Sequence, residues 1–427
     1  MLGTLLGATL VGADVKTWIP GAATYFSAED GVALNRVRTT SGQTFWYEIF
    51  PSILFAQLAD RNPWWSDGRK MARMQAGVWA KAADAMKGDF DHTSIDLRTM
   101  KPHDNGRWRE PDSAAGLAYL QLGAGDLRAS KVALDALQAM KVNPTYELLM
   151  SYGALAAARM NAEQGTAYDV PRFVDWCLEP SPTRPGWGMV TGRWGDYDIG
   201  GLVGSTTDGG GYAFAMNTFV LGGNLAPLAR YDDRFSAAVA RWFVNAASAA
   251  RLFYGVGLPE GHLSTPEWTG DPGQVIPCEG LRKEWKGVAP VAMGDPTVHG
   301  WAKTDRCLYA GGYAGIFGAI VKPTAVPRIL RLDLRATDFF APKGYPTELV
   351  WNPYEETRTV TLDLGPKPVR LWDAVGNREL ARRAKGAFKL KLTADQAVQI
   401  VQIPATLAVA RKDGKLVADG KTVDFRL

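Results

Sequence analysis

Cysteine and histidine are scarce in this sequence of 427 residues, which holds three cysteines and four histidines. The cysteines, Cys177, Cys278 and Cys307, are odd in number and widely spaced, which excludes a disulfide framework and a Cys-X-X-Cys metal knuckle. No His-Glu-X-X-His motif occurs, and His92 and His103 are eleven residues apart. The sequence therefore predicts neither a bound metal nor a cofactor.

Runs of one charge and long apolar runs are also missing. Residues 343–427 hold 15 basic and 10 acidic residues, and the totals of 48 and 44 leave 33 and 34 for residues 1–342. Without a basic run that could follow a phosphate backbone, a nucleic-acid partner is not expected. No stretch comes near the roughly eighteen apolar residues that a membrane helix needs, and nothing in the sequence indicates an oligomeric state.

The longest uncharged segment near the start is residues 2–13 (LGTLLGATLVGA). Small residues end it, as in the core of a secretory signal, but no positively charged region precedes it. A secreted or periplasmic protein and a buried strand at the start of the fold are the two interpretations of this segment.

From residue 44 to about residue 321 the apolar residues recur at helical spacing. Between Asp232 and Gly255, for example, Phe235, Val239 and Trp242 follow three- and four-residue steps. The other stretches expected to be helical are 45–60, 67–86, 112–122, 126–140, 146–164, 170–178, 212–229 and 307–320. Consecutive helices without intervening strands favour stacked helical hairpins over a βαβ sheet.

After Pro342 the apolar period changes from helical to alternating. Val360, Leu362 and Leu364 alternate with polar residues, as a half-buried strand requires. Two Asp-Gly pairs, at 413–414 and 419–420, are strong hairpin signals. The predicted organisation is an extended segment over 1–43, an α-helical body over 44–342, and a small antiparallel β-sandwich with a terminal hairpin over 343–427.

This order of elements resembles that of known enzymes. A many-helix body followed by 349–354 (LVWNPY), 359–365 (TVTLDLG), 371–375 (LWDAV) and 398–404 (VQIVQIP) resembles bacterial carbohydrate-active enzymes of the (α/α)6-toroid type with a C-terminal β-sandwich. Glycoside hydrolases and polysaccharide lyases both have that architecture. The resemblance implies a toroid-like catalytic body, and it carries no catalytic residue over to this chain.

Tryptophan is abundant, with 15 copies, about two to three times the number expected in an average chain of this length. Thirteen of them lie in the first 342 residues. Those at helical positions are expected in the core. Those in loops beside glycine and charged residues could instead present a ring to the C–H face of a sugar. These candidates for carbohydrate binding are Trp108, Trp187, Trp194, Trp268 and Trp301.

The most glycine-rich loop is 186–211, where ten of 26 residues are glycine. So much glycine lets a backbone approach a ligand closely. Asp208, at the end of this loop, is interpreted either as a helix cap or as the first candidate for a catalytic carboxylate. Its expected companions in catalysis and binding are Tyr212, Arg193, Asn217 and Arg230.

Two further regions gather polar side chains. Residues 90–112 hold His92, Arg107, Trp108 and Glu110, with Asp112 interpreted as the cap of the next helix. Residues 258–269 and 276–283 contribute His262, Trp268 and Glu279. Catalytic roles are predicted for Glu110, Glu279 and His92, and binding roles for Arg107 and His262.

Glycoside hydrolysis needs one protonated and one ionised carboxyl group, and Asp208 with Glu110 or Glu279 could supply them. The sequence therefore predicts a glycosidase that acts on an oligo- or polysaccharide in an aromatic-lined cleft. The first alternative is a polysaccharide lyase, with Tyr212, Asn217, Arg230 and His262 around a uronate whose carboxylate binds arginine. The second alternative is a glycan-binding protein without catalysis.

Overall fold

The structure is a computed structural model, which describes residues 1–37, 41–184, 186–205, 211–254, 257–263, 279–293 and 312–426. The chain forms two compact units. Unit 1 comprises residues 1–157, 168–221 and 246–316, and unit 2 comprises residues 158–167, 222–245 and 317–427. Among the described residues, no helix is both long enough and apolar enough to cross a membrane.

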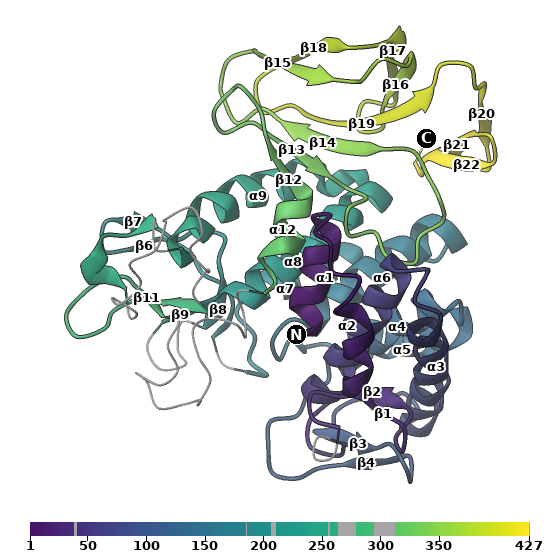
Figure 1. The fold of residues 1–427 in the computed structure, drawn as a ribbon, viewed down its shortest axis with the longest axis vertical. Helices are drawn as coiled ribbons and strands as arrows, with labels where there is room; N and C mark the ends of the chain where they lie inside the picture. Colours follow the sequence, from purple (N-terminus) through teal and green to yellow (C-terminus); the bar gives the residue numbers. More distant parts are fainter. Residues whose placement is uncertain are drawn as a thin grey trace. The chain divides into compact units, whose positions relative to one another are not determined.

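Helices dominate the first two thirds of the chain, as predicted (Figure 1). Most begin and end within a few residues of the expected positions, because the apolar spacing fixes which face is buried. Their bounds are α1 Leu2–Leu10, α2 Phe45–Arg61, α3 Ser66–Met86, α4 Ser113–Ala124, α5 Leu127–Ala139, α6 Leu149–Gln164, α7 Val170–Leu178, α8 Ala215–Tyr231, α9 Ser236–Ala250 and α12 Ala314–Ile320.

Two kinds of helix alternate along the chain. Helices α2, α4, α6 and α8 are buried almost all round, whereas α3, α5, α7 and α9 bury one face. In α5 the buried residues Ala129, Ala133 and Leu137 repeat every four positions, as one stripe requires. Helix α2 packs against α3 and α4, and α4 packs against α5. Within unit 1, the buried helices α2 and α4 therefore alternate with α3 and α5, which pack against them.

The segment 2–13 is helical over Leu2–Leu10, so the prediction of a buried strand is wrong. Leu2, Leu5 and Leu6 are buried, and α1 contacts α2. Glycine permits a close approach between α1 and the start of α12: a Cβ on Gly7 would lie 2.9 Å from the backbone oxygen of Gly312, and one on Gly315 would lie 2.5 Å from Gly7. The leucines and Ala8 of α1 are strong helix formers, and only Thr4 and Thr9 are β-branched.

The helix expected at 212–229 begins three residues later than predicted. Residues Tyr212–Phe214 form strand β9, and only Ala215 begins α8. Strand β9 pairs with β8 (Val203–Ser205) and β10 (Gly280–Arg282) in a five-stranded sheet of order β11-β10-β9-β8-β5. The outer members of this sheet are β11 Val291–Met293 and β5 Trp187–Met189. Neighbouring glycines make this pairing close, since a Cβ on Gly204 would lie 2.0 Å from the backbone oxygen of Tyr212.

Three two-stranded ribbons also occur among the described residues of unit 1. They are β1 Phe26–Ser27 with β2 Val32–Ala33, β3 Ser94–Asp96 with β4 Lys101–His103, and β6 Arg193–Trp194 with β7 Tyr197–Asp198. The second ribbon stands in the long loop that leads into α4.

Unit 2 contains the predicted antiparallel β-module, and its strands begin at Val321. A six-stranded sheet has the order β12-β13-β14-β19-β16-β17, and β15 pairs with β18 in a second sheet. Their bounds are β12 Val321–Pro323, β13 Leu330–Asp333, β14 Thr347–Trp351, β15 Arg358–Asp363, β16 Val369–Asp373, β17 Arg378–Ala384, β18 Ala387–Leu392 and β19 Ala397–Pro404. Residues Val350, Leu371 and Ile400 of the first sheet share one apolar cluster with Val360 and Leu390 of the second. The module is therefore sandwich-like.

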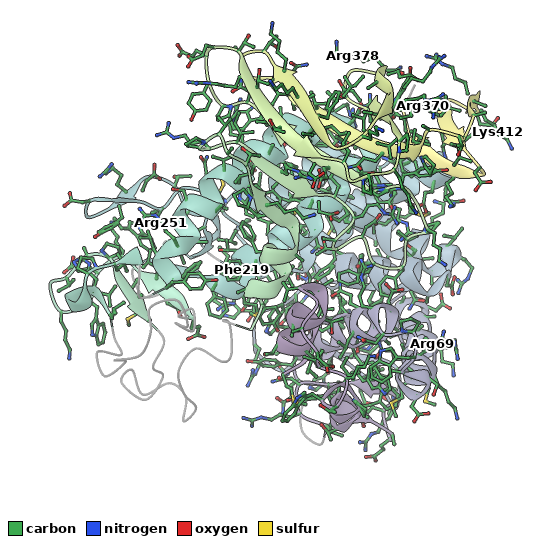
Figure 2. The ribbon with its side chains drawn as sticks, turned by 45° about the horizontal axis from the view of Figure 1, so that its top comes forward. Arg69, Phe219, Arg251, Arg370, Arg378 and Lys412 are labelled. Atoms are coloured by element: carbon green, nitrogen blue, oxygen red, sulfur yellow. The ribbon has the colours of Figure 1, made fainter. Side chains whose placement is uncertain are left out.

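Both predicted turns at the end of the chain are confirmed. Strands β20 Val409–Lys412, β21 Lys415–Ala418 and β22 Lys421–Asp424 form one antiparallel ribbon. Asp413 and Asp419 have φ values of 49° and 46°, and the glycines after them are also left-handed, as these turns require. Figure 2 labels two charged side chains of this module, Arg378 and Lys412. It also labels Phe219 of α8, which is buried.

Candidate active site

The N-terminal end of α2 holds the first candidate carboxyl group. Thr44 caps this helix by accepting a hydrogen bond from the backbone N–H of Tyr47. The backbone N–H of Trp46, one residue before Tyr47, donates to Oε2 of Glu110 at 2.5 Å. The backbone N–H of Glu110 donates to the carbonyl of His92 at 2.9 Å. The loop before α4 thus places Glu110 at the first turn of α2, where Trp46 lies 64 residues earlier in the sequence.

Glu110 is almost completely enclosed. Its exposed fraction is 1%, and its Oε1 has no hydrogen-bond partner. Burial raises the pKa of Glu110 well above its ordinary value, and the nearby carboxyl groups of Asp112 and Glu147 raise it further. The hydrogen bond from Trp46 acts in the opposite direction and is outweighed. The environment therefore favours the protonated form of Glu110.

Asp112 occupies the predicted N-cap position of α4, but its carboxyl group does not cap the helix. Its side chain makes no capping hydrogen bond, because its backbone is already helical, with φ −68° and ψ −1°. Oδ2 instead accepts from the backbone N–H of Tyr146 at 3.1 Å, and Oδ1 has no partner. Burial raises the pKa of Asp112 to about 7. Asp112 joins the start of α4 to the segment that leads into α6.

Glu147, in that segment, forms an ion pair with Arg184. Its side chain keeps 12% of its surface exposed, and that of Arg184 keeps 20%. The guanidinium carbon of Arg184 lies 4.8 Å from the ring centre of Tyr146 and 4.3 Å from that of Trp187, so two aromatic rings hold it. We refer to Glu110, Asp112 and Glu147 as the carboxyl cluster.

An aromatic cavity lies beside the first turns of α2, and its lining residue Trp46 connects it to Glu110 of the carboxyl cluster. It has a volume of about 230 Å³ and lies within unit 1. Its lining includes Trp46, Tyr47, Phe50, Tyr25 and Tyr313. The rings of Trp46 and Phe50 stack with their centres 4.6 Å apart and their planes at 10°. Trp46 therefore lines the cavity and, through its backbone N–H, binds Glu110.

Tyr47 links the cavity to the charged groups. Burial and then the charge of Glu147 raise the pKa of Tyr47, while the charges of Arg107 and Arg184 lower it. Burial, followed by the charge of Glu147, likewise raises the pKa of Tyr146. Both phenols therefore remain protonated at neutral pH and can donate hydrogen bonds.

A second polar group lies on the five-stranded sheet of unit 1. Glu279, just before β10, is buried, and burial raises its pKa to about 8 against a hydrogen bond from the Tyr212 hydroxyl. Tyr212 pairs with Arg282 in the β9–β10 register, and the guanidinium carbon of Arg282 lies 4.9 Å from its ring centre. The structure thus brings together the predicted residues Glu279 and Tyr212.

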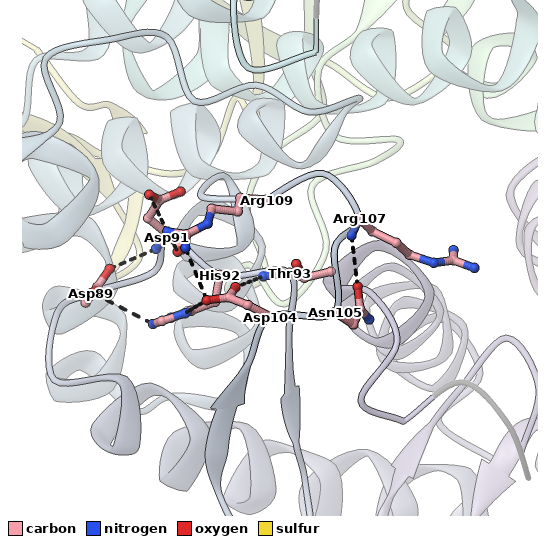
Figure 3. A network of polar contacts seen from close by, with 8 residues as sticks. All are labelled: Asp89, Asp91, His92, Thr93, Asp104, Asn105, Arg107 and Arg109. Atoms are coloured by element: carbon pink, nitrogen blue, oxygen red, sulfur yellow. Dashed lines mark hydrogen bonds and ion pairs between the residues drawn. The ribbon is translucent and has the colours of Figure 1, made fainter.

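His92, predicted to be catalytic, belongs to a network of polar contacts on the loop before α4. Its Nδ1 lies 3.2 Å from Oδ2 of Asp104, and its Nε2 lies 3.7 Å from Oδ2 of Asp89. Arg109 bonds to Asp91 and Asp104 in the same network. Figure 3 shows these side chains converging around the ring of His92. In this arrangement His92 holds the loop that carries Glu110.

Some of the remaining predicted residues are buried, and others are exposed. Trp187 and Trp194 are buried, whereas 55% of Trp108 is exposed. Asn217 is fully buried, and neither polar atom of its side chain has a partner. Arg193 is exposed and donates to the backbone of Asp196.

Two more predicted residues have structural partners. The Nδ1 atom of His262 lies 2.7 Å from the backbone oxygen of Pro290. Arg230 belongs to unit 2, where its guanidinium bonds at 2.9 Å to Asp338, which is buried, and its own side chain keeps 9% of its surface exposed. Arg230 therefore lies outside the unit that holds the carboxyl cluster. Asp208, Trp268 and Trp301 lie outside the described residues.

Sequence reasoning missed Glu147, Arg184 and Tyr47. One signal could have found two of them: Tyr47-Glu48 and Tyr146-Glu147 each lie at the start of a stretch predicted to be helical.

No group of three or more histidine, cysteine, aspartate or glutamate side chains within the described ranges could hold a metal ion. In the comparisons with known proteins, no family model matches the chain, and no curated protein matches it.

Proposed function

We propose that this protein is a glycoside hydrolase whose catalytic carboxyl groups are Glu147 and Glu110. The observation that carries the proposal is the contrast between the two environments. Glu110 is buried with one unpartnered oxygen, while Glu147 is partly exposed and has Arg184 as its counter-ion. Pairs of carboxyl groups whose surroundings favour opposite protonation states are characteristic of acid and base assignments.

In the proposed reaction Glu110 donates its proton to the glycosidic oxygen as the bond from that oxygen to the anomeric carbon breaks. Glu147, as the carboxylate, accepts a proton from the attacking water or attacks the anomeric carbon itself. The distance between the two carboxyl groups in the sugar complex selects between these routes. The protonated hydroxyls of Tyr47 and Tyr146 suit hydrogen bonds to sugar oxygens.

The aromatic cavity supports a carbohydrate as the substrate. Its stacked Trp46 and Phe50 and the further rings of Tyr25 and Tyr313 offer apolar faces, and Asn35 adds a polar group. The cavity combines these rings with polar lining atoms, and ring faces together with placed polar groups suit the binding of a small ligand. Sugar rings match such a lining because they have apolar C–H faces and polar edges.

The helix arrangement supports an (α/α) toroid as the scaffold. Fully buried α2, α4, α6 and α8 alternate with one-sided α3, α5, α7 and α9, which is the pattern expected of an inner and an outer ring. In this scheme the carboxyl cluster lies at the N-terminal ends of inner helices.

The test is a pair of conservative substitutions assayed on a panel of neutral and acidic polysaccharides. We expect Glu147→Gln and Glu110→Gln each to lower kcat by about 10²- to 10⁴-fold, the usual contribution of a general acid or base. Glu29→Gln, at an exposed side chain paired with Arg98, is the matched control and should keep full activity. Urea unfolding of each variant separates lost chemistry from lost folding. Full activity in either active-site variant contradicts the assignment.

Elimination by a polysaccharide lyase is the second candidate, favoured by the Tyr212, Glu279 and Arg282 group. Arginine next to a tyrosine suits a uronate whose neighbouring C–H is to be deprotonated. The same panel, read by the absorbance of unsaturated uronates, distinguishes the two reactions. Loss of that absorbance in Tyr212→Phe, with Glu147→Gln still active, would favour the lyase. Binding without either product would leave a non-catalytic glycan-binding protein.

A further inference from the structure

Arg107 differs from the other arginines around the candidate site. Arg109 is paired with Asp91 and Asp104, and Arg184 is paired with Glu147. For Arg107 the only hydrogen bond within the described chain involves its backbone, whose N–H donates to Oδ1 of Asn105 at 3.2 Å. Figure 3 shows its side chain extending away from the His92 network. Its guanidinium thus keeps all its N–H donors for a ligand.

The loop that carries Arg107 is fixed at both ends against the start of α2. Before Arg107, the side-chain amide of Asn105 donates to the backbone oxygen of Gln43 at 2.6 Å. After it, Glu110 accepts from the N–H of Trp46 at 2.5 Å. These two hydrogen bonds hold Arg107 near Tyr47, which lines the aromatic cavity. The charge of Arg107 lowers the pKa of Tyr47. The cation is therefore held at the candidate site.

Trp108 follows Arg107 on the same loop. More than half of its surface is exposed, in contrast to the buried Trp187 and Trp194. An exposed indole ring gains apolar contact when a sugar lies on it. An unpaired guanidinium next to an exposed ring matches a sugar that has both a C–H face and a carboxylate.

We propose that Arg107 and Trp108 form a subsite for a uronate residue, which makes the substrate an acidic glycan. The sugar carboxylate binds the guanidinium of Arg107 through two parallel N–H···O bonds, while the pyranose ring lies against Trp108. This inference deepens the proposed function, since it names the substrate class for the site of Glu110 and Glu147. The helical body has almost no net charge, so attraction for the anion comes from this local group.

The test measures binding rather than turnover, so it does not depend on catalysis. The probes are oligogalacturonate, oligoalginate and hyaluronan oligosaccharides, each next to its carboxyl-reduced form, titrated calorimetrically into the full chain and into Glu147→Gln. We expect at least one acidic probe to bind at least tenfold more tightly than its reduced form. Arg107→Gln should abolish that difference, and Trp108→Ala should weaken binding of both forms.

The matched control is Arg69→Gln, which removes an exposed arginine of α3 labelled in Figure 2 and should leave both affinities unchanged. Arg107→Lys should restore only part of the preference, since an ammonium group cannot form the planar pair of bonds. The proposal is overturned if no acidic probe binds more tightly than its reduced form, or if Arg107→Gln weakens both forms equally. Selective binding lost in Arg107→Gln, together with full activity in Glu147→Gln, would uphold the subsite and refute the catalytic assignment.

Discussion

Asp112→Asn isolates the one carboxyl group of the cluster that is fully buried and has a pKa near neutrality. Burial raises the pKa of Asp112 to about 7, against about 3.9 for an aspartate in an unfolded chain. Asparagine has nearly the same shape and keeps an acceptor for the backbone N–H of Tyr146. The substitution therefore removes the ionisation and leaves the packing.

The direction of the pH dependence of stability follows from whether the folded or the unfolded state binds the proton of Asp112 more tightly. Because the folded pKa of Asp112 is the higher one, its contribution to stability is fully present below pH 4 and is lost as the pH rises to about 7. The difference of about three pKa units corresponds to about 4 kcal/mol. We expect Asp112→Asn to match the wild type near pH 4 and to exceed its free energy of unfolding by about 4 kcal/mol at pH 8.

Urea unfolding followed by circular dichroism at pH 4, 6 and 8 measures this difference. Leu117→Ala, at a fully buried position of the same helix, is the control. It should cost about 2 to 5 kcal/mol at every pH, because it removes packing and no titrating group. If the stability of Asp112→Asn falls between pH 4 and 8 as steeply as that of the wild type, the reasoning is refuted.

Two further predictions concern packing and buried charge. Gly7→Leu should lower stability by at least about 1 to 3 kcal/mol in thermal unfolding, because α12 leaves no room for its side chain, whereas Gly77→Ala, whose Cβ meets nothing within 4 Å, should raise it by about 0.5 to 1 kcal/mol. If Gly7→Leu is as stable as Gly77→Ala, the close crossing of α1 and α12 is contradicted. In unit 2, Asp338→Ala should cost about 3 to 5 kcal/mol, because Asp338 accepts from Arg230 at 2.9 Å and from the Tyr231 hydroxyl at 3.0 Å; a loss below about 1 kcal/mol in urea unfolding would contradict it.

Most helices were predictable from their apolar spacing, both the one-sided α7 and helices buried almost all round, such as α2 and α4. The Asp-Gly pairs located the terminal ribbon. Residues 2–10 were predicted wrongly because periodicity alone does not distinguish a short, uncharged apolar strand from a short buried helix. Tyr212–Phe214 misled for another reason: pairing with β8 and β10, which lie elsewhere in the sequence, decided its conformation.

The site was predictable only in part, since sequence shows which residues are near along the chain and not which helix ends meet. Glu110 was predicted as a candidate because it shares a loop with Trp108 and Arg107. Glu147 was missed because its partners come from the loop before α4 and from Arg184, 37 residues away. Asp112 had the sequence position of a cap, yet its carboxyl group bonds to Tyr146, across 34 residues.

Each buried carboxyl group of the cluster accepts a backbone N–H from a different segment: Glu110 from Trp46 and Asp112 from Tyr146. Such bonds lower a carboxyl pKa, but burial outweighs them at both residues. The same enclosure that keeps Glu110 protonated therefore costs stability above neutral pH. Asp112→Asn relieves that cost and also removes one carboxyl group that raises the pKa of Glu110. We therefore expect this variant to be more stable at pH 8 and, if Glu110 is the acid, to lose activity at a lower pH than the wild type.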